Sequence, residues 1–414
     1  MTVPQSIIDA FDLRSLPDDF YRDPFPYYDA LRNADPIRRL PDGGYFLTRF
    51  KDCETVYRDP ITFSSDKKQE FKPKYGDTLV YEHHTTSLVF NDPPLHTKVR
   101  KLIVGALTPK AIAQMEPGLV RLVGQLLDRM AKKEAAGESV DLIADFAAAI
   151  PIEIIGNLLD IPQADRGPLR GWSLLILGAL EPTISAAQLA KADQAVREFL
   201  DYLEGLVADR KRHPGDAQTD VLTRLLQGEV EGERLSHKEL LQNCIFILNA
   251  GHETTTNLIA NALVTLARWP QEKQKLIADA SLTRSAIEEV LRFESSNQLG
   301  NRITTVDTEV GGVAMPKGTR ITTCIGAANR DPEAFAEPNV FDIARAPNKH
   351  LAFASGPHLC AGLTLARLEG RIALELFLQR FPDYTLDGEP ERSRRARFRG
   401  FNRVAVKLNG AGSG

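Results

Sequence analysis

The sequence predicts a mainly α-helical fold with a minor β-rich region. Helical periodicity of apolar side chains covers residues 117–136, 140–160, 185–211 and 236–268, and the last stretch spans about nine helical turns. Strand-like patterns are short and cluster near the two ends of the chain. The 414 residues, 43% hydrophobic and 26% charged, are typical of a globular protein with a large core.

The elements near the two ends are indicated by turn residues. Prolines in the opening turn predict a helix over residues 24–31. Residues 37–40 and 45–48 flank Asp42-Gly43-Gly44, which predicts a hairpin. Towards the other end, residues 303–323 predict short strands separated by glycine- and proline-containing turns.

The longest helix carries its own boundary signals. Ser236 and Glu239 have the spacing of a capping box, and Pro270 ends the helical pattern. In the helix predicted at 140–160, Pro151 predicts a kink, because proline removes a backbone hydrogen bond.

One domain is expected over residues 1–408. The sequence has no internal repeat, low-complexity linker or abrupt change of composition. Residues 409–414 are rich in glycine and predict a disordered tail.

Composition also restricts the class of partner. The net charge of −4 favours neither nucleic acid nor a membrane surface. No signal peptide is apparent, and no stretch approaches the ~18 consecutive apolar residues of a membrane span. The four cysteines are far apart, which is typical of a reducing compartment. We expect a cytoplasmic, monomeric protein with no nucleic-acid or membrane partner.

Cys360 is the most informative residue of the chain. It ends the glycine-punctuated run 353–362, immediately before a helix-forming stretch. The positive end of a helix dipole is expected to lower the pKa of such a thiol and to favour the thiolate. No second ligand lies at zinc spacing, whereas one thiolate suffices as the axial ligand of a haem iron. The alternative is a buried cysteine that acts as a small hydrophobic residue.

The run Phe353-x-x-Gly356-x-His358-x-Cys360-x-Gly362 resembles the haem-binding loop of the cytochrome P450 family. The resemblance is to the soluble, bacterial-type haem-thiolate monooxygenases. It implies haem b (iron protoporphyrin IX) with Cys360 as axial ligand, bound between the long central helix and the helix after the cysteine loop. Phe353, Gly356, His358 and Gly362 would contact the haem.

A second motif lies in the middle of the long helix, at Ala250-Gly251 and Glu253-Thr254. The hydroxyl of Thr254 can donate to the carbonyl of Ala250 and bend the helix. In the resembled family, this turn contacts the haem through Ala250 and Gly251 and leaves room for dioxygen. Glu253 and Thr254 would be the catalytic acid and alcohol that organise protons. The alternative is a solvent-facing His-Glu pair followed by core threonines.

Four side chains resemble the family's contacts to the haem propionates: His96, Arg100, Arg302 and His358. His96 and Arg100 are spaced i,i+4 on one helix face, and Arg302 precedes a strand. Together they would give charge-assisted hydrogen bonds to two carboxylates. The alternative for each is an ordinary surface cation.

Glu289 and Arg292 resemble the family's Glu-x-x-Arg pair. At i,i+3 they share a helix face and can form an ion pair. The resemblance implies a buried structural pair, completed by a third residue somewhere between Asn339 and Arg345. The alternative is a solvated surface bridge.

Substrate contacts are predicted from the long helix, the strand before Arg302 and the C-terminal segment: Phe246, Asn249, Asn297, Gln298, Arg397 and Phe398. If Glu253 faces the haem, Phe246 and Asn249 share its helix face. Aromatic walls and amides suit an oxygenated lipophile. Arg397 could anchor a carboxylate, or it could belong to the solvated basic run 392–399. Residues 72–87 would form a lid.

The resemblance also implies separate redox partners, because no flavin or iron–sulfur motif is present. A ferredoxin or flavodoxin, reduced by an NAD(P)H-dependent reductase, is expected to dock near Lys98, Lys101 and Arg367. The function expected is dioxygen-dependent hydroxylation or other oxygenation of a small lipophilic, oxygenated or carboxylate-bearing molecule. The alternatives are a peroxide-driven or rearranging haem-thiolate enzyme and a non-catalytic haem sensor.

Overall fold

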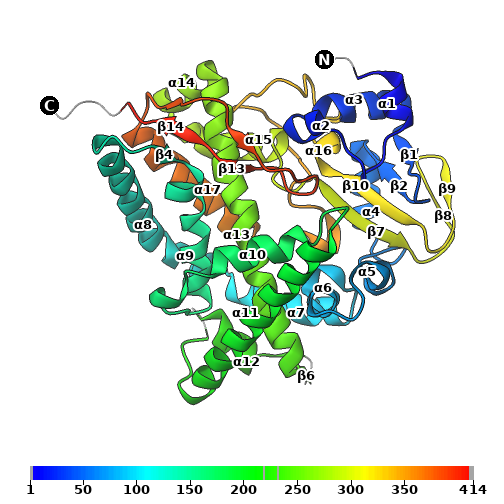
Figure 1. The fold of residues 1–414 in the computed structure, drawn as a ribbon, viewed down its shortest axis with the longest axis horizontal. Helices are drawn as coiled ribbons and strands as arrows, with labels where there is room; N and C mark the ends of the chain where they lie inside the picture. The colour runs from blue at the N-terminus through cyan, green and yellow to red at the C-terminus, as the bar shows by residue number, and fades with distance from the viewer. Residues whose placement is uncertain (1–2, 218–219, 231–232, 410–414) are drawn as a thin grey trace.

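The computed structural model describes residues 3–217, 220–230 and 233–409. Most of the helices lie on one side of the molecule, and strands β1, β2, β7, β8, β9 and β10 lie on the other side with the N-terminal helices (Figure 1). Helix α13 (His237–Arg268) runs through the middle of the helical part. The mainly helical fold with a minor β-rich region is confirmed.

The other helices come in chain order. They are α1 (Gln5–Asp9), α2 (Asp18–Arg22), α3 (Phe25–Ala34), α4 (Phe50–Arg58), α5 (Lys68–Tyr75), α6 (Leu79–Thr86), η1 (Leu88–Phe90), α7 (Leu95–Ala106), α8 (Pro109–Ala135), η2 (Ile143–Ala147), α9 (Ala149–Leu158), η3 (Gln163–Asp165), α10 (Leu169–Gly178), α11 (Ala186–Arg212), α12 (Val221–Gln227), α14 (Pro270–Ala278), η4 (Ala280–Leu282), α15 (Thr283–Phe293), α16 (Ile325–Ala328), η5 (Gly356–His358) and α17 (Leu363–Arg380).

The strands are short. They are β1 (Ile37–Arg39), β2 (Tyr45–Leu47), β3 (Phe63–Ser64), β4 (Val140–Asp141), β5 (Glu229–Val230), β6 (Glu233–Arg234), β7 (Leu299–Thr304), β8 (Thr308–Val310), β9 (Val313–Met315), β10 (Arg320–Cys324), β11 (Thr385–Leu386), β12 (Glu391–Arg392), β13 (Phe401–Arg403) and β14 (Ala405–Lys407).

Helix α13 begins where the sequence predicts. The Ser236 hydroxyl accepts the N–H of Glu239 at 3.2 Å, and the Glu239 carboxylate accepts the N–H of Ser236 at 2.8 Å. This reciprocal pair satisfies two of the amides that a helix start leaves without partners. Apolar side chains along α13 join the main hydrophobic core, so the helix is held by packing on several sides.

The main sheet has the strand order β1-β2-β10-β7-β3. The predicted hairpin is confirmed, with Ile37 opposite Leu47 in the β1–β2 register. Strand β7 is antiparallel to β10 and places Arg302 opposite Ile321. Alternation along β7 therefore turns Arg302 to the face opposite that of Asn301.

Two expectations about the elements were wrong. Helices α1 and α2 precede the helix predicted as the first one. The stretch 140–160 is not one helix, because β4 pairs with β14 before the short π-helix η2 and α9 begin. Pro151 is the third residue of α9, and helical backbone precedes it through Ala148 and η2, so the kink predicted there stays a prediction.

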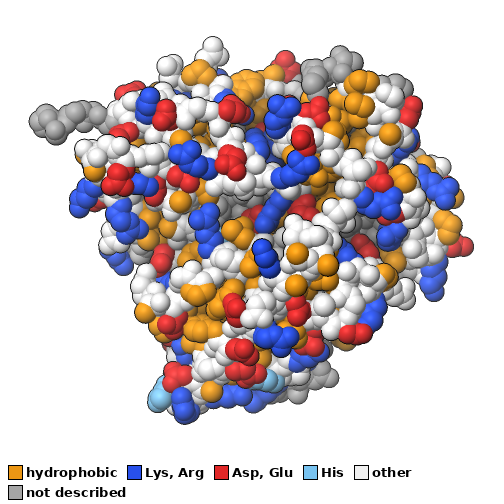
Figure 2. Space-filling model, viewed as in Figure 1, with side chains coloured by type: hydrophobic (Ala, Val, Ile, Leu, Met, Phe, Trp, Pro, Cys, Tyr) orange, Lys and Arg blue, Asp and Glu red, His pale blue; other side chains and the backbone are white. Residues whose placement is uncertain are grey.

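The end of the chain is only partly described. The Asn409 side chain donates to the carbonyl of Asp383 at 2.9 Å, and residues 410–414 of the predicted tail lie outside the described residues. The single domain over 1–408 stays a prediction. Among the described residues, no helix is long and apolar enough to cross a membrane. Figure 2 shows acidic and basic side chains interspersed over the visible face.

Candidate active site

The cysteine loop is held by backbone contacts. The N–H of Cys360 donates to the carbonyl of Phe353 at 2.9 Å, which closes the loop. Gly356 has a φ of +67°, and a Cβ there would lie 2.5 Å from the carbonyl oxygen of Tyr57. Only glycine tolerates both the left-handed backbone and this approach to α4. Gly362 then caps α17.

Cys360 differs from the other cysteines of the chain. Cys53, Cys244 and Cys324 are fully buried in the core, as small hydrophobic residues are, whereas Cys360 is half-buried. Burial raises the pKa of the Cys360 thiol more than the Gly362 N–H and Arg100 lower it. The expected lowering of this pKa is therefore wrong for the thiol in these surroundings. A metal ion would have to displace the proton.

The four side chains predicted to hold propionates form a cluster whose positive charge comes from Arg100 and Arg302. The rings of His96 and His358 lie 4.1 Å apart between centroids. Arg302 and Arg100 both lower the pKa of His358, which burial brings down to about 2. The buried Nε2 atom of His358 has no hydrogen-bond partner. Within the described residues, no carboxylate accepts a hydrogen bond from any of the four, so two propionates would fit this cluster.

One turn of α13 presents an open surface. Ala250 is exposed and Thr254 half-exposed, although Leu248, Asn249 and the turn after Thr254 are buried. The Thr254 hydroxyl donates to the Ala250 carbonyl at 2.7 Å, as the sequence predicts. A Cβ at Gly251 would lie 2.8 Å from the Cδ1 atom of Ile155 on α9. Open space beside a turn with small side chains fits a flat prosthetic group.

Glu253 does not share that open surface. Its two carboxylate oxygens accept from Nη1 of Arg395 at 2.5 and 2.6 Å, and Nη2 of Arg395 donates to the carbonyl of Leu174. Burial raises the pKa of Glu253 to about 7, although Arg395 opposes the rise. In the structure the Glu253 carboxylate is turned to Arg395 of the C-terminal segment. That Glu253 faces the haem together with Phe246 and Asn249 stays a prediction.

The alternative of a solvent-facing His-Glu pair is also wrong. His252 is 1% exposed and Glu253 5% exposed. Neither ring nitrogen of His252 has a hydrogen-bond partner, and burial lowers the pKa of His252 to about 3. Sequence reasoning missed Arg395, because nothing in the basic run 392–399 distinguishes it from its neighbours.

The Glu289–Arg292 pair is buried, with both side chains 0% exposed. Arg292 donates to Glu289 through Nε at 2.8 Å and Nη2 at 2.7 Å. Nε of Arg345 also donates to the Glu289 carboxylate at 3.2 Å, and the side-chain amide of Asn348 donates to it at 3.0 Å. The third member is therefore Arg345, inside the predicted range, and the solvated-bridge alternative is wrong.

The predicted substrate residues on α13 lie in different environments. Phe246 is half-buried. Asn249 is buried, and its Nδ2 atom lies 3.3 Å from Nε2 of His83 on α6. The Nδ1 atom of His83 lies 3.0 Å from Oε1 of Gln242. Asn249 therefore ties α13 to the predicted lid, which is helical as α5 and α6.

The substrate residues outside α13 meet at the C-terminal segment. Asn297 forms a bridge with Phe398, and the N–H of Gln298 donates to the carbonyl of Arg397 at 2.7 Å. Gln298 is buried, and its side chain donates to the carbonyl of Ser295. Arg397 is turned inward, so the interpretation of a solvated basic run is wrong for this residue.

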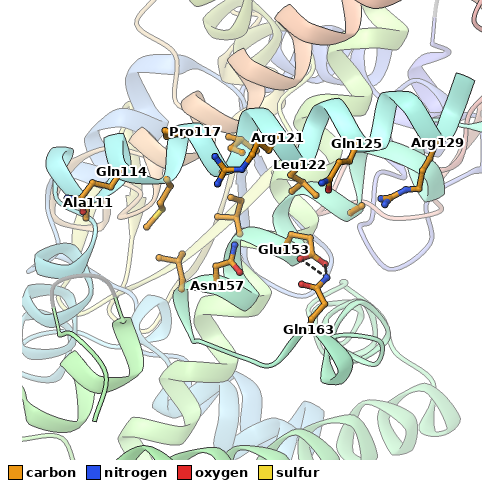
Figure 3. Close-up of a pocket in the computed structure, with 16 residues that line it drawn as sticks. Ala111, Gln114, Pro117, Arg121, Leu122, Gln125, Arg129, Glu153, Asn157 and Gln163 are labelled. Carbon is orange, nitrogen blue, oxygen red and sulfur yellow. Dashed lines mark hydrogen bonds between the residues drawn. The ribbon is translucent and has the colours of Figure 1, made fainter. Parts of the chain in front are cut away.

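A separate cavity of about 590 Å³ lies between α8 and α9 (Figure 3). Arg121 and Gln125 of α8 and Glu153 and Asn157 of α9 line it, and Glu153 accepts a hydrogen bond from Gln163. None of the side chains predicted from the sequence to form the site belongs to this lining.

Comparison with known proteins decides the family. The cytochrome P450 family model matches residues 175–394. The chain belongs to the cytochrome P450 family. It is 34% identical over 371 residues to the biotin biosynthesis cytochrome P450 of Bacillus subtilis, covering 89% of this chain and 91% of that protein. It is also 34% identical over 387 residues to the cytochrome P450 monooxygenase PikC of Streptomyces venezuelae. That match covers 92% of this chain and 89% of PikC.

The fold agrees with this assignment. The crystal structure of P450BioI in complex with hexadec-9Z-enoic acid ligated acyl carrier protein has a TM-score of 0.87 to this chain. The two are 32% identical, and the match covers 94% of this chain and 100% of that one. This cytochrome P450 is therefore a haem-thiolate monooxygenase, with haem on an axial cysteine as its cofactor.

Proposed function

We propose that this cytochrome P450 hydroxylates or otherwise oxygenates a small lipophilic molecule that carries a polar group, using dioxygen and two electrons from separate redox proteins. The observation that carries the proposal is the open turn of α13, where Thr254 is bonded back to Ala250 and the small side chains leave space. The acyl chain in the related P450BioI complex supports a lipophilic substrate.

Each group of residues has a distinct role in holding the cofactor. Cys360 would ligate the haem iron, and the cluster of His96, Arg100, Arg302 and His358 would hold the propionates. Ala250, Gly251, Phe353, Gly356 and Gly362 shape the walls on the two sides. Glu289 and Arg292 act structurally, because Arg345 and Asn348 join them to the segment before the cysteine loop.

Glu253 and Thr254 handle protons. When bound, the haem supplies dioxygen binding and the electron-transfer chemistry. The Thr254 hydroxyl lies on the open turn, where it can orient a water molecule. Glu253 has a pKa of about 7, so near neutral pH it can both release and take up a proton. Movement away from Arg395 would be needed for its carboxyl to reach that turn.

Substrate contacts come from both ends of the site. Phe246 and Phe398 supply aromatic surface, while Asn249, Asn297 and Gln298 supply amides. The buried Oδ1 atoms of Asn249 and Asn297 and Oε1 of Gln298 have no protein partner, which supports binding of a hydrogen-bond donor or ordered water.

A ferredoxin or flavodoxin with an NAD(P)H-dependent reductase supplies the electrons, and we place its docking site near Lys98, Lys101 and Arg367. Arg367 is paired in two bonds with Glu288, and Lys98 lies 3.6 Å from Glu239. These pairs reduce the local positive charge, so docking is expected to depend only moderately on salt. We further propose a cytoplasmic monomer.

Two measurements test this function. The carbon monoxide complex of the reduced protein should have the Soret position of a thiolate-ligated haem, and Cys360→Ser should lose it. NADH-driven turnover with ferredoxin and its reductase should then give oxygenated product. Product formed only with added peroxide would favour the peroxide-driven alternative, and a histidine-type Soret band would refute the site.

A further inference from the structure

Arg397 is an inward-facing guanidinium whose side chain has only neutral partners. Nε donates to the carbonyl of Leu180 at 3.1 Å, and Nη1 donates to the carbonyl of Leu299 at 2.8 Å. Nη2 donates to the side-chain oxygen of Asn301. A largely buried cation is costly unless an anion compensates its charge, and carbonyl dipoles do so only in part.

Lys74 is a second cation beside Arg397. Its Nζ atom donates to the carbonyl of Glu181 at 2.5 Å, one residue along the chain from the carbonyl that Arg397 holds. Burial, together with repulsion by Arg397, lowers the pKa of Lys74 to about 8. The two cationic heads therefore contact successive residues of one segment, and Lys74 is protonated at neutral pH.

The nearby carboxylates are already engaged. The Glu181 carboxylate accepts the backbone N–H groups of Ala396 and Arg397, and burial raises the pKa of Glu181. Glu70 pairs with Lys67 at 2.9 Å. The region around α5 thus holds the three cations Lys67, Lys74 and Arg397 against two carboxylates, Glu70 and Glu181. A positive charge is left over.

The cations beside α5 also interact with the propionate cluster. Lys67 is repelled by both Arg302 of that cluster and Arg397, so Lys67 lies near both of them. The Tyr75 hydroxyl donates to the carbonyl of Ala179 at 2.6 Å and joins α5 to the end of α10. Arg397 and Lys74 therefore lie where the lid helix meets the C-terminal segment that carries Phe398.

We propose that Arg397 and Lys74 form the binding site for the carboxylate of an amphipathic substrate, whose apolar part extends towards the open turn of α13. This assignment rests on the proposed monooxygenase function and narrows its substrate class. A carboxylate accepts bidentate bonds from a guanidinium and a third bond from an ammonium group, so it would compensate both cations at once.

The test compares two ligands that differ only in charge. Dodecanoate and methyl dodecanoate are titrated into the haem-loaded protein, and the dissociation constant is read from the ligand-induced Soret shift and from calorimetry. We expect dodecanoate to bind at least about tenfold more tightly, which corresponds to ~1.4 kcal/mol. Arg397→Gln should remove this preference and leave the ester affinity unchanged.

A matched control comes from the same segment. Arg394 is exposed and pairs with Asp18, so Arg394→Gln should leave the binding of both ligands unchanged. Lys74→Met provides a second test, because it removes the ammonium group without touching the contacts of Arg397. It should weaken dodecanoate binding and spare the ester.

The pH dependence separates Lys74 from Arg397. As the pH rises through about 8, Lys74 loses its proton and the affinity for dodecanoate should fall. Glu70 and Glu181 favour the charged form of Lys74, Arg397 opposes it, and His84 is neutral because burial lowers its pKa. In Lys74→Met this fall should be absent.

Failure of this inference is distinguishable from failure of the proposed function. If acid and ester bind equally to the wild-type protein, or if Arg397→Gln and Lys74→Met weaken both ligands alike, the carboxylate site is refuted. The monooxygenase proposal would survive if NADH-driven turnover of the ester is still observed. Loss of the thiolate-type Soret band would instead refute the proposed function, whichever ligand binds.

Discussion

Neighbouring residues of the α13 motif meet different surroundings. Thr254 lies on the open turn, whereas Glu253 is buried against Arg395 of the C-terminal segment. The Glu253 carboxyl is thus desolvated and charge-compensated at the same time, and these two effects oppose each other in its pKa. The result is an acid whose pKa lies near neutral although its carboxylate is buried against Arg395.

Removal of the Arg395 charge is expected to raise the pKa of Glu253 further. Burial and Glu181 already raise this pKa, and Arg395 is the group that lowers it. In Arg395→Gln the carboxyl should stay protonated to a pH about one unit higher. The pH profile of product formed per NADH consumed should shift to the alkaline side, while Arg395→Lys should retain the wild-type profile. An unchanged profile in Arg395→Gln would contradict this role.

Glu369 on α17 is a second buried acid, 3% exposed, and burial raises its pKa to about 8. Between pH 4.5 and 8 the unfolded chain releases this proton and the folded chain keeps it. Stability should therefore fall with rising pH in that window, by roughly 1.4 kcal/mol per unit. Glu369→Gln should be more stable than the wild type at pH 8 but not at pH 4.5, as measured by urea unfolding. Parallel stability curves would refute this.

At the scale of elements, α15 is fixed to the loop that precedes Cys360. The buried Glu289 accepts from Arg292 of its own helix and from Arg345 and Asn348 of that loop. Arg292 also donates to the carbonyls of Asn329 and Pro338. The ion pair thus acts as a connector between a helix and an irregular segment that has few backbone bonds of its own.

Loss of Arg345 should loosen this connection without unfolding the protein. Arg345→Ala is expected to cost ~1–3 kcal/mol, because Glu289 keeps Arg292 as partner, and to speed haem transfer to an apo-globin acceptor. Arg292→Ala should cost more, about 3–5 kcal/mol, since it removes the two shorter charged bonds to a fully buried carboxylate and leaves Arg345 at 3.2 Å as its remaining cation. Arg284→Ala, an exposed arginine of the same helix, is the control. Equal haem loss from Arg284→Ala and Arg345→Ala would contradict the connector role.

At the scale of the whole molecule, one carboxylate joins three distant segments. Glu294, after α15, accepts from Arg399 at 2.6 Å and from Arg392 at 3.4 Å, and Arg330 lies 3.8 Å away. The guanidinium of Arg330 also stacks between Phe25 of α3 and Phe293, which adds cation–π attraction. The N-terminal helices, α15 and the C-terminal segment meet here.

Glu294→Gln should therefore be among the most destabilising single substitutions in this chain. It leaves Arg330, Arg392 and Arg399 buried without a carboxylate, and we expect a loss of about 3–5 kcal/mol in urea unfolding. The exposed ion pair of Arg394 with Asp18 offers the comparison, and Arg394→Gln should cost less than about 1 kcal/mol. Similar costs for the two variants would show that cation–π contacts alone stabilise the three arginines.

Short motifs in the sequence determined many of the helices and strands and part of the candidate site. The capping box predicted the start of α13, and the loop around Cys360 predicted the cofactor, because both depend on a few residues at short spacing. Helices α3 and α11 and the β1–β2 hairpin were predictable for the same reason. The division of residues 140–160 into a strand and two helices was not predictable, because it depends on the pairing of β4 with β14 near the other end of the chain.

Tertiary structure alone decided which charges meet. Arg395 lies 142 residues from Glu253, and Arg345 lies 56 residues from Glu289. In the sequence, Arg394, Arg395 and Arg397 belong to one basic run. Folding leaves Arg394 on the surface, pairs Arg395 with an acid and leaves Arg397 with neutral partners only. Burial sets the energy of each charge, and burial is a property of the packed molecule rather than of the local sequence.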